Sequence, residues 1–205
     1  MMVPVEDGLR VRLMGGLSVD GVPERQIGSR KARLLLARLA AARGETVPVE
    51  HVADALWGEV LPARPADQVG VLVSRLRAVI GADRIVRRSA GYALCDVWLD
   101  VEEVELRVGE ASAAYADGRL AAARAAADAA LALVRGELLP SEDGEWVLVA
   151  RERVAATVAA ARRIKVEAAL GASDWPGAVT QAEAMLADHP YDEAVLRALM
   201  RAHAA

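Results

Sequence analysis

The sequence predicts a mainly α-helical protein in two parts: three helices combined with short antiparallel strands, followed by an entirely helical part. Three observations support this prediction. An amphipathic helix followed at once by two short strands occupies Val69–Tyr92, and after Asp100 the chain becomes Ala-rich, acidic and continuously helical in pattern. Within that second part, one spacing of large and small residues occurs twice. We therefore expect one domain over residues 1–99 and another over residues 100–205.

The chain is expected to open with a small antiparallel sheet. Leu9–Leu13 alternates apolar and cationic residues, which is the period of a half-buried strand. Leu17–Val19 and Arg25–Ile27 flank the turn-forming segment Asp20–Pro23, so these two segments are expected to pair as a hairpin.

Two helices follow the expected sheet. Ser29 can cap a helix over Arg30–Arg43, because its hydroxyl can accept a hydrogen bond from an exposed amide of the first turn. Pro48 suits the first turn of a second helix over Val49–Trp57. The segment 59–65 holds two prolines and is expected to be a loop.

The third helix is amphipathic and is followed by a basic hairpin. Asp67 is expected to cap this helix, which runs to about Ile80, and two short strands then turn back on themselves around Arg87, Arg88 and Gly91. Three helices with such a wing are typical of a winged helix-turn-helix domain, whose third helix enters the major groove of DNA. The residues expected on the buried face are Val69, Leu72, Val73, Leu76 and Ile80, and those on the exposed face are Val71, Ser74, Arg75 and Ala78.

The second part is expected to form five helices, at about 101–117, 119–134, 144–171, 176–188 and 191–204. Small residues recur where paired antiparallel helices would cross, as in tetratricopeptide (TPR) repeats. Alanine-rich helices without any repeat are the alternative. The repeated spacing joins Leu120, Ala123 and Leu131 in the first copy and Trp175, Ala178 and Leu186 in the second.

Charge is distributed unevenly, although the net charge is −4. Residues 1–99 hold 14 Lys and Arg against 11 Asp and Glu, whereas residues 100–205 hold 11 against 18. Such asymmetry suggests a basic binding module joined to an acidic one, and chance variation in surface charge is the alternative. The chain has no apolar run long enough to span a membrane and no cluster with metal-ligand spacing, so we expect neither a membrane contact nor a cofactor.

The segments GSRKARLLLARLAAARGETVPVEHVADALWG, VSRLRAVIG and GYAL resemble the winged-helix domain of OmpR-type response regulators. With the acidic helical part that begins LDVEEVE, the whole chain is similar to the Streptomyces antibiotic regulatory protein (SARP) family, which adds a TPR-like bacterial transcriptional activation domain. The resemblance implies a cytoplasmic, sequence-specific transcriptional activator that binds promoter repeats, often side by side, and contacts RNA polymerase and its sigma factor.

The family's activation domain runs on past the point where this chain stops. We therefore expect the second domain to be incomplete at its C-terminus, with a fragment of a longer regulator and a shortened family member as the alternatives.

Five residues of the third helix and the wing are the first candidates for DNA contacts. Ser74, Arg75 and Arg77 can reach the major groove, where arginine binds guanine through two hydrogen bonds or braces a phosphate. Arg87 and Arg88 can reach the minor groove or the flanking backbone. A solvated helix face and an edge strand kept soluble by charge are the alternatives.

Three further cations are weaker candidates. Arg30 and Lys31 open the first helix, where they oppose the helix dipole, so a nearby phosphate would relieve the conflict. An exposed pair without a role is the alternative. Arg64, in the loop before the third helix, could contact DNA or polymerase. Gly91 and Tyr92 are expected to shape the hairpin, the glycine at a turn or bulge and the tyrosine as a packed anchor.

The sequence thus predicts a DNA-binding activator that is not an enzyme, since it shows no constellation of nucleophile, base and oxyanion donors. A TPR-like protein-interaction scaffold, with a winged-helix module that does not bind DNA, is the competing hypothesis. The expected partners are double-stranded promoter DNA, RNA polymerase with its sigma factor, and further copies of the chain on DNA.

Overall fold

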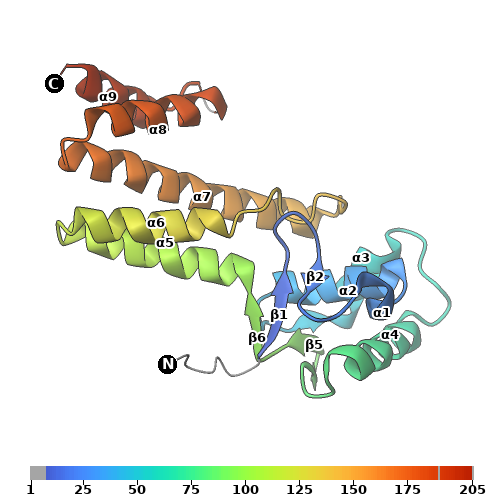
Figure 1. The fold of residues 1–205 in the computed structure, drawn as a ribbon. Coiled ribbons are helices and arrows are strands. Elements are labelled where there is room, and N and C mark those ends of the chain that lie inside the picture. The colour runs from blue at the N-terminus through green and yellow to red at the C-terminus, as the bar shows by residue number, and fades with distance from the viewer. Residues whose placement is uncertain (1–7, 189, 205) are drawn as a thin grey trace, which may run out of the picture. The chain divides into compact units, whose positions relative to one another are not determined.

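The computed structural model describes residues 8–188 and 190–204, which divide into two compact units (Figure 1). The first unit contains the described residues up to Glu102 together with Gly136–Arg151. The second contains Glu103–Arg135 and the described residues from Glu152 onward. The mainly α-helical fold, with a winged helix at its N-terminal side, is confirmed.

The first sheet has three strands in the order β2-β1-β6, namely β1 (Leu9–Arg12), β2 (Ser18–Val19) and β6 (Val97–Leu99). Strand β1 pairs antiparallel with β2 and parallel with β6, so the sheet is mixed. The predicted hairpin strand Arg25–Ile27 is wrong: these residues belong to a short helix, α1 (Glu24–Ile27). The chain leaves the sheet at Pro23, which lacks the N–H that a ladder needs, and β6 occupies the other edge of β1.

Three helices form the core of the first unit: α2 (Arg30–Ala41), α3 (Val49–Trp57) and α4 (Pro65–Ile80). The predicted cap on α2 is confirmed, because Ser29 Oγ accepts a hydrogen bond of 3.3 Å from the Ala32 amide. Helix α4 begins two residues before the predicted cap at Asp67, since Pro65 has the backbone angle that a first helical residue requires. All five residues predicted on its apolar face are buried.

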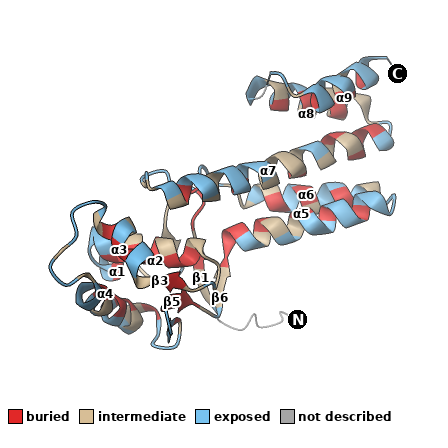
Figure 2. Cartoon of the chain, turned by 180° about the vertical axis from the view of Figure 1, so that it is seen from behind, coloured by how far each residue is buried: buried red, intermediate tan, exposed pale blue. Residues whose placement is uncertain are grey.

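The wing consists of β4 (Ile85–Arg88) and β5 (Gly91–Leu94), which pair antiparallel across the turn Ser89-Ala90. A further short strand, β3 (Val47–Pro48), pairs with the other edge of β5 and places Pro48 opposite Gly91. Figure 2 shows buried residues on the strands at the centre of this unit. Gly91 therefore lies within a strand, not in the turn where the sequence had suggested it, and there it allows two backbones to approach closely.

The carboxylate of Asp100 is buried at the start of α5 (Asp100–Ala116). It accepts hydrogen bonds from the backbone amides of Leu13 at 2.9 Å, Met14 at 3.0 Å and Val101 at 3.0 Å. The end of β1 is thereby fixed to the chain segment that follows β6, although 87 residues separate Leu13 from Asp100.

Replacing Asp100 with asparagine should lower the free energy of unfolding by on the order of 3 kcal/mol, because the charged acceptor is lost and an amide NH₂ then faces backbone N–H donors. Chemical denaturation followed by circular dichroism measures the change. Asp83→Asn, at an exposed position of the same unit, is the matched control and should leave stability unchanged. Equal unfolding midpoints for the two variants would contradict the structural role of Asp100.

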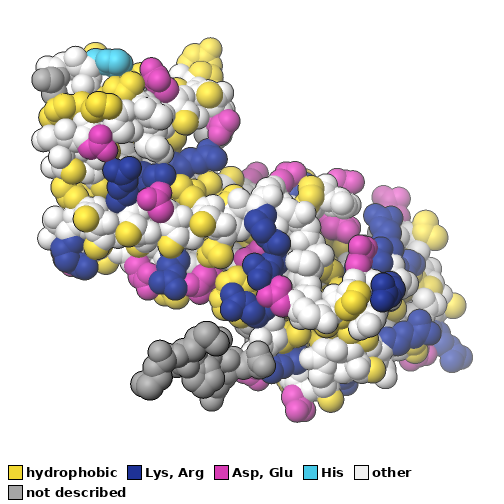
Figure 3. Space-filling model, viewed as in Figure 1, with side chains coloured by type: hydrophobic (Ala, Val, Ile, Leu, Met, Phe, Trp, Pro, Cys, Tyr) yellow, Lys and Arg dark blue, Asp and Glu magenta, His cyan; other side chains and the backbone are white. Residues whose placement is uncertain are grey.

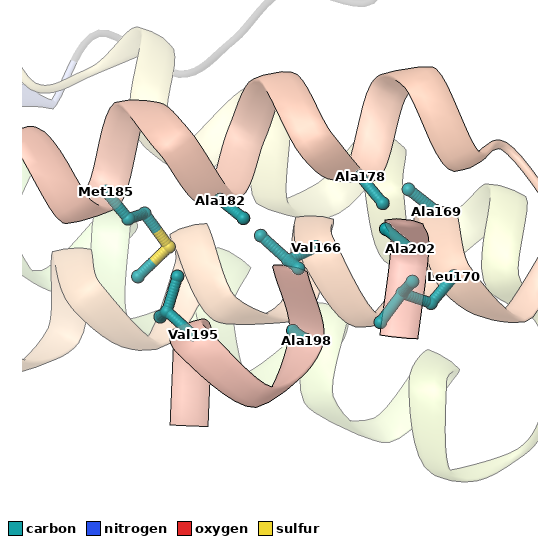
Figure 4. Close-up of a cluster of buried hydrophobic side chains, with 9 residues drawn as sticks. All are labelled: Val166, Ala169, Leu170, Ala178, Ala182, Met185, Val195, Ala198 and Ala202. Carbon is teal, nitrogen blue, oxygen red and sulfur yellow. The ribbon is translucent and has the colours of Figure 1, made fainter. Parts of the chain in front are cut away.

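The chain after β6 contains α5, α6 (Leu120–Ala132), α7 (Glu145–Gly171), α8 (Trp175–Asp188) and α9 (Glu193–His203). The five predicted helices are confirmed to within three residues at each end. Ala123 and Ala178, the small residues of the repeated spacing, are fully buried. Figure 4 shows Ala178 and Ala182 of α8 facing residues of α7 and α9 in one apolar cluster. None of the described helices is both long and apolar enough to cross a membrane.

The segment 136–151 connects α6 to the first turns of α7 and packs within the first unit. Leu139 donates a backbone hydrogen bond to the Leu13 carbonyl at 3.0 Å, and Gly15 donates one to Glu137 at 2.8 Å. The Trp146 ring lies 5.4 Å from the Arg38 guanidinium. The boundary expected at residue 99/100 therefore differs from the observed units, because this later segment returns to the winged-helix part.

Candidate nucleic-acid interface

The exposed face of α4 is the centre of the candidate interface. The structure places Ser74 and Arg75 on this face, together with Val71, whose side chain is 51% exposed. Among the described residues, Arg75 has no hydrogen-bond or ion-pair partner. Its guanidinium is therefore available to an external anion without loss of a hydrogen bond or ion pair to the described residues.

Arg77 lies only two residues further along α4 but has a different environment. It is half-buried, and its Nε and Nη2 atoms donate to the Ile85 carbonyl at 2.9 and 2.6 Å. These bonds join α4 to the first strand of the wing. Arg77 thus fixes the position of the wing, whereas the sequence had suggested a contact with DNA equivalent to that of Arg75.

The two arginines of the wing lie on opposite faces of β4, as adjacent strand residues do. Arg87 Nη1 donates to the Tyr92 hydroxyl at 2.8 Å, and its guanidinium lies 4.8 Å from the ring centre. A Cβ atom placed on Gly70 of α4 would lie 4.0 Å from the same hydroxyl. Tyr92 therefore holds Arg87 beside α4.

Arg88 is directed to the other face of the hairpin. Its Nη1 donates to the Gly44 carbonyl at 3.2 Å and to Thr46 Oγ1 at 3.3 Å, and Nη2 lies 3.6 Å from Cys95 Sγ. Arg88 thus does not share the surface that Arg87 and α4 present.

Lys31, at the start of α2, lies on the opposite flank of α4 from the wing. Its Nζ is 4.8 Å from the Trp57 ring centre, and it lines with Arg75 a groove of about 280 Å³. Figure 3 shows Lys and Arg side chains over the region where Figure 1 places α2 to α4. The structure therefore brings two cations 44 positions apart in sequence to one surface.

The remaining two candidates do not line this groove. Arg30 is exposed and lines two other grooves, each of which also includes Glu142, and one of which also includes Lys31 and Trp57. Arg64 is exposed at the start of α4 and forms a 4.0 Å ion pair with Asp67. The described residues contain no group of His, Cys, Asp and Glu that could hold a metal ion.

Sequence reasoning missed Gln68, which is exposed and lines the same groove as Lys31 and Arg75. The missed signal was its spacing from Val71 and Arg75, since positions three and seven apart share one side of a helix. With Asp67 as the predicted cap, Gln68 would have been the first residue of the helix, whereas it is the fourth residue of α4.

Three packed helices followed by a strand hairpin define this part of the chain as a winged helix-turn-helix domain. Residues 99–205 match the family model described as the bacterial transcriptional activator domain. The chain belongs to the SARP family of transcriptional regulators, which carry that domain.

Three relatives show how far the similarity extends. The regulatory protein AfsR of Streptomyces griseus is 30% identical over 95% of this chain and 20% of its own length. The transcriptional regulatory protein EmbR of Mycobacterium tuberculosis is 30% identical over 97% of this chain and 54% of its own length. A solved structure of M. tuberculosis EmbR with a low-affinity phosphopeptide has a TM-score of 0.84 and 28% identity, covering 97% of this chain and 55% of that one. The chain thus spans between one fifth and about half of these relatives.

Proposed function

We propose that this chain is a sequence-specific DNA-binding activator of transcription, with DNA binding in residues 1–99 and activation in residues 100–205. The observation that carries the proposal is Arg75 on the exposed face of α4, which has no hydrogen-bond or ion-pair partner in the described part of the chain. It is flanked by Lys31 in the same groove and by Arg87 beside Gly70. The family to which the chain belongs and the names of its relatives support the proposal.

The first contribution to binding would be electrostatic attraction between these cations and the phosphates of DNA. Cations on both flanks of α4 can neutralise phosphates on either side of the major groove and so fix the orientation of the helix. Arg75, at the centre of the face, would then reach a base edge. The overall negative charge does not oppose this, because residues 29–93 hold 11 Lys and Arg against 6 Asp and Glu.

The helical residues after 100 would supply the contact with RNA polymerase and its sigma factor. Their acidic balance makes them poorly suited to contact DNA, so a protein partner fits them better. Side-by-side binding on repeated promoter elements would place copies of this part next to one another.

Recovery of bound genomic fragments, followed by footprinting of the best fragment, tests the proposal. We expect repeats spaced by about 10–10.5 bp, one helical turn, and an affinity that falls steeply as salt rises because phosphate contacts release counterions. A tight protein ligand without any salt-dependent binding to DNA would instead support the interaction scaffold.

Tyr92→Phe tests how Arg87 is held. The substitution removes the hydroxyl that accepts from Arg87 but keeps the ring. We expect DNA affinity to fall about two- to tenfold, with a loss of stability of about 1 kcal/mol, the net value of one hydrogen bond. Fluorescence anisotropy with labelled promoter DNA measures the affinity.

Tyr115→Phe is the matched control, because it removes a hydroxyl that donates to Glu167 in the second unit. It should leave DNA affinity unchanged. In an Arg87→Ala background, Tyr92→Phe should have no further effect on DNA affinity. Additive losses in the double variant would show that Tyr92 does not act through Arg87.

A further inference from the structure

We propose that Gln68 and Val71 determine the sequence specificity of the interface, with Gln68 binding an adenine and Val71 contacting the methyl group of a thymine. The proposal rests on the proposed function and adds to it the bases that the third helix selects.

Position on the helix is the first argument. Gln68 is the fourth residue of α4, and Val71 and Arg75 follow it on the same side. The N-terminal residues of a recognition helix are those that contact base edges. All three side chains are exposed and line the groove that Lys31 also lines, so one bound duplex could meet all of them.

The chemistry of Gln68 fits adenine. A glutamine amide offers one donor and one acceptor, which match adenine N7 and N6 in the major groove. Among the described residues, the Gln68 side chain has no hydrogen-bond partner, and only its backbone amide is engaged, donating to the Arg64 carbonyl at 3.2 Å. Both amide groups are therefore available to a base.

Val71 fits a thymine methyl group. It is an apolar side chain that is exposed, whereas its apolar neighbours on the helix, Val69, Leu72 and Val73, are buried. Its branched side chain is already restricted in χ1, so little conformational freedom is lost when it packs against a base. Contact between the Val71 side chain and the C5 methyl group of thymine would remove both of these apolar groups from water.

The charges that line the groove favour contact with DNA base edges over contact with the phosphate backbone at this end of α4. Asp67 lines the groove and forms a 4.0 Å ion pair with Arg64, so its carboxylate would oppose the attraction of a phosphate to this end of α4. Lys31, on the other wall, would attract one. The duplex would then lie with a phosphate near Lys31 and base edges toward Gln68 and Val71.

Selection from a random DNA library with the full chain tests the assignment to adenine. Wild type should select adenine at one position, where Gln68→Ala should lose the preference, with affinity for the selected site reduced about 5- to 100-fold. Gln26→Ala, an exposed glutamine in α1, is the matched control and should select the same sequence as wild type.

Replacing each thymine of the selected site in turn by deoxyuridine removes only a methyl group. One replacement should weaken binding by wild type about fourfold, the value of one buried methyl group, and should not weaken binding by Val71→Ala. Val149→Ala, an exposed valine in α7, should respond as wild type does.

Failure of the assignment of Gln68 and Val71 can be distinguished from failure of the proposed function. A selected site bound by wild type, with unaltered base preferences in Gln68→Ala and equal deoxyuridine effects in Val71→Ala, would overturn the assignment of these residues. Absence of any selected sequence and of salt-dependent binding would overturn the proposed function itself.

Discussion

Replacing Gly91 with alanine should lower the free energy of unfolding by about 3 kcal/mol or more, at the upper end of the range for overpacking. A Cβ atom at this position would lie against the Val47 carbonyl group, 2.6 Å from its carbon and 2.8 Å from Pro48 Cα. These are backbone atoms, which cannot rotate away as a side chain can. The added methyl group would therefore separate β3 from β5 and displace the buried Tyr92.

Gly109→Ala is the matched control for this prediction. Gly109 lies within α5, and a Cβ atom there would have no neighbour within 4 Å. The same substitution should therefore stabilise the protein by about 0.5–1 kcal/mol, through helix propensity alone.

Denaturant unfolding followed by tryptophan fluorescence measures both changes, since Trp57, Trp98 and Trp146 lie in the first unit with Gly91, and Trp175 lies in the second unit with Gly109. Opposite shifts of the unfolding midpoint are expected. If Gly91→Ala shifted the midpoint in the same direction as Gly109→Ala, the close approach of β3 and β5 would not be real.

Features set by neighbouring residues could be predicted from the sequence. The buried face of α4 was predicted correctly because a helix has one period and its apolar residues follow it. The wing was predicted because its two strands are separated by only two residues. In each case the partners that stabilise the element lie within a few residues of one another.

Features that depend on distant parts of the chain could not be predicted. Strand β6 pairs with β1 across more than 80 residues, and the amides that bind the Asp100 carboxylate are equally remote in sequence. The return of residues 136–151 to the first unit depends on contacts such as that of Trp146 with Arg38. No local pattern encodes these pairings, because several partners would satisfy the same strand edge or carboxylate.

The candidate site also has features that the sequence could predict and features that it could not. Ser74, Arg75 and Arg77 could be placed on α4 from the sequence, but not the accessibility of each side chain. The wing places the Ile85 carbonyl against Arg77 and leaves Arg75 without a hydrogen-bond or ion-pair partner among the residues that the structure describes. Residue type and helix position are thus insufficient to distinguish a free cation from a paired one, since the partners of a paired cation come from the next element of the fold.

Arg75→Ala should weaken specific DNA binding by about 1–3 kcal/mol, which is about 5- to 150-fold in affinity, without a measurable loss of stability. Stability should hold because Arg75 makes no hydrogen bond or ion pair with the described residues that its removal could break. Arg77→Ala should behave differently. Its two hydrogen bonds to Ile85 would be lost, so both stability and binding should decrease.

The salt dependence of the Arg75→Ala variant distinguishes the two kinds of contact that this side chain could make. Loss of a phosphate contact would reduce the slope of log affinity against log salt by about 1 and weaken all sequences equally, whereas loss of a base contact would relax specificity at one position. The base contact is expected, because Arg75 is at the centre of the exposed face while Lys31 and Arg87 lie on its flanks. Arg197→Ala, which removes the same charge from an exposed position of α9, should leave both affinity and salt slope unchanged. Equal binding by Arg75→Ala and Arg197→Ala would exclude Arg75 from the DNA interface.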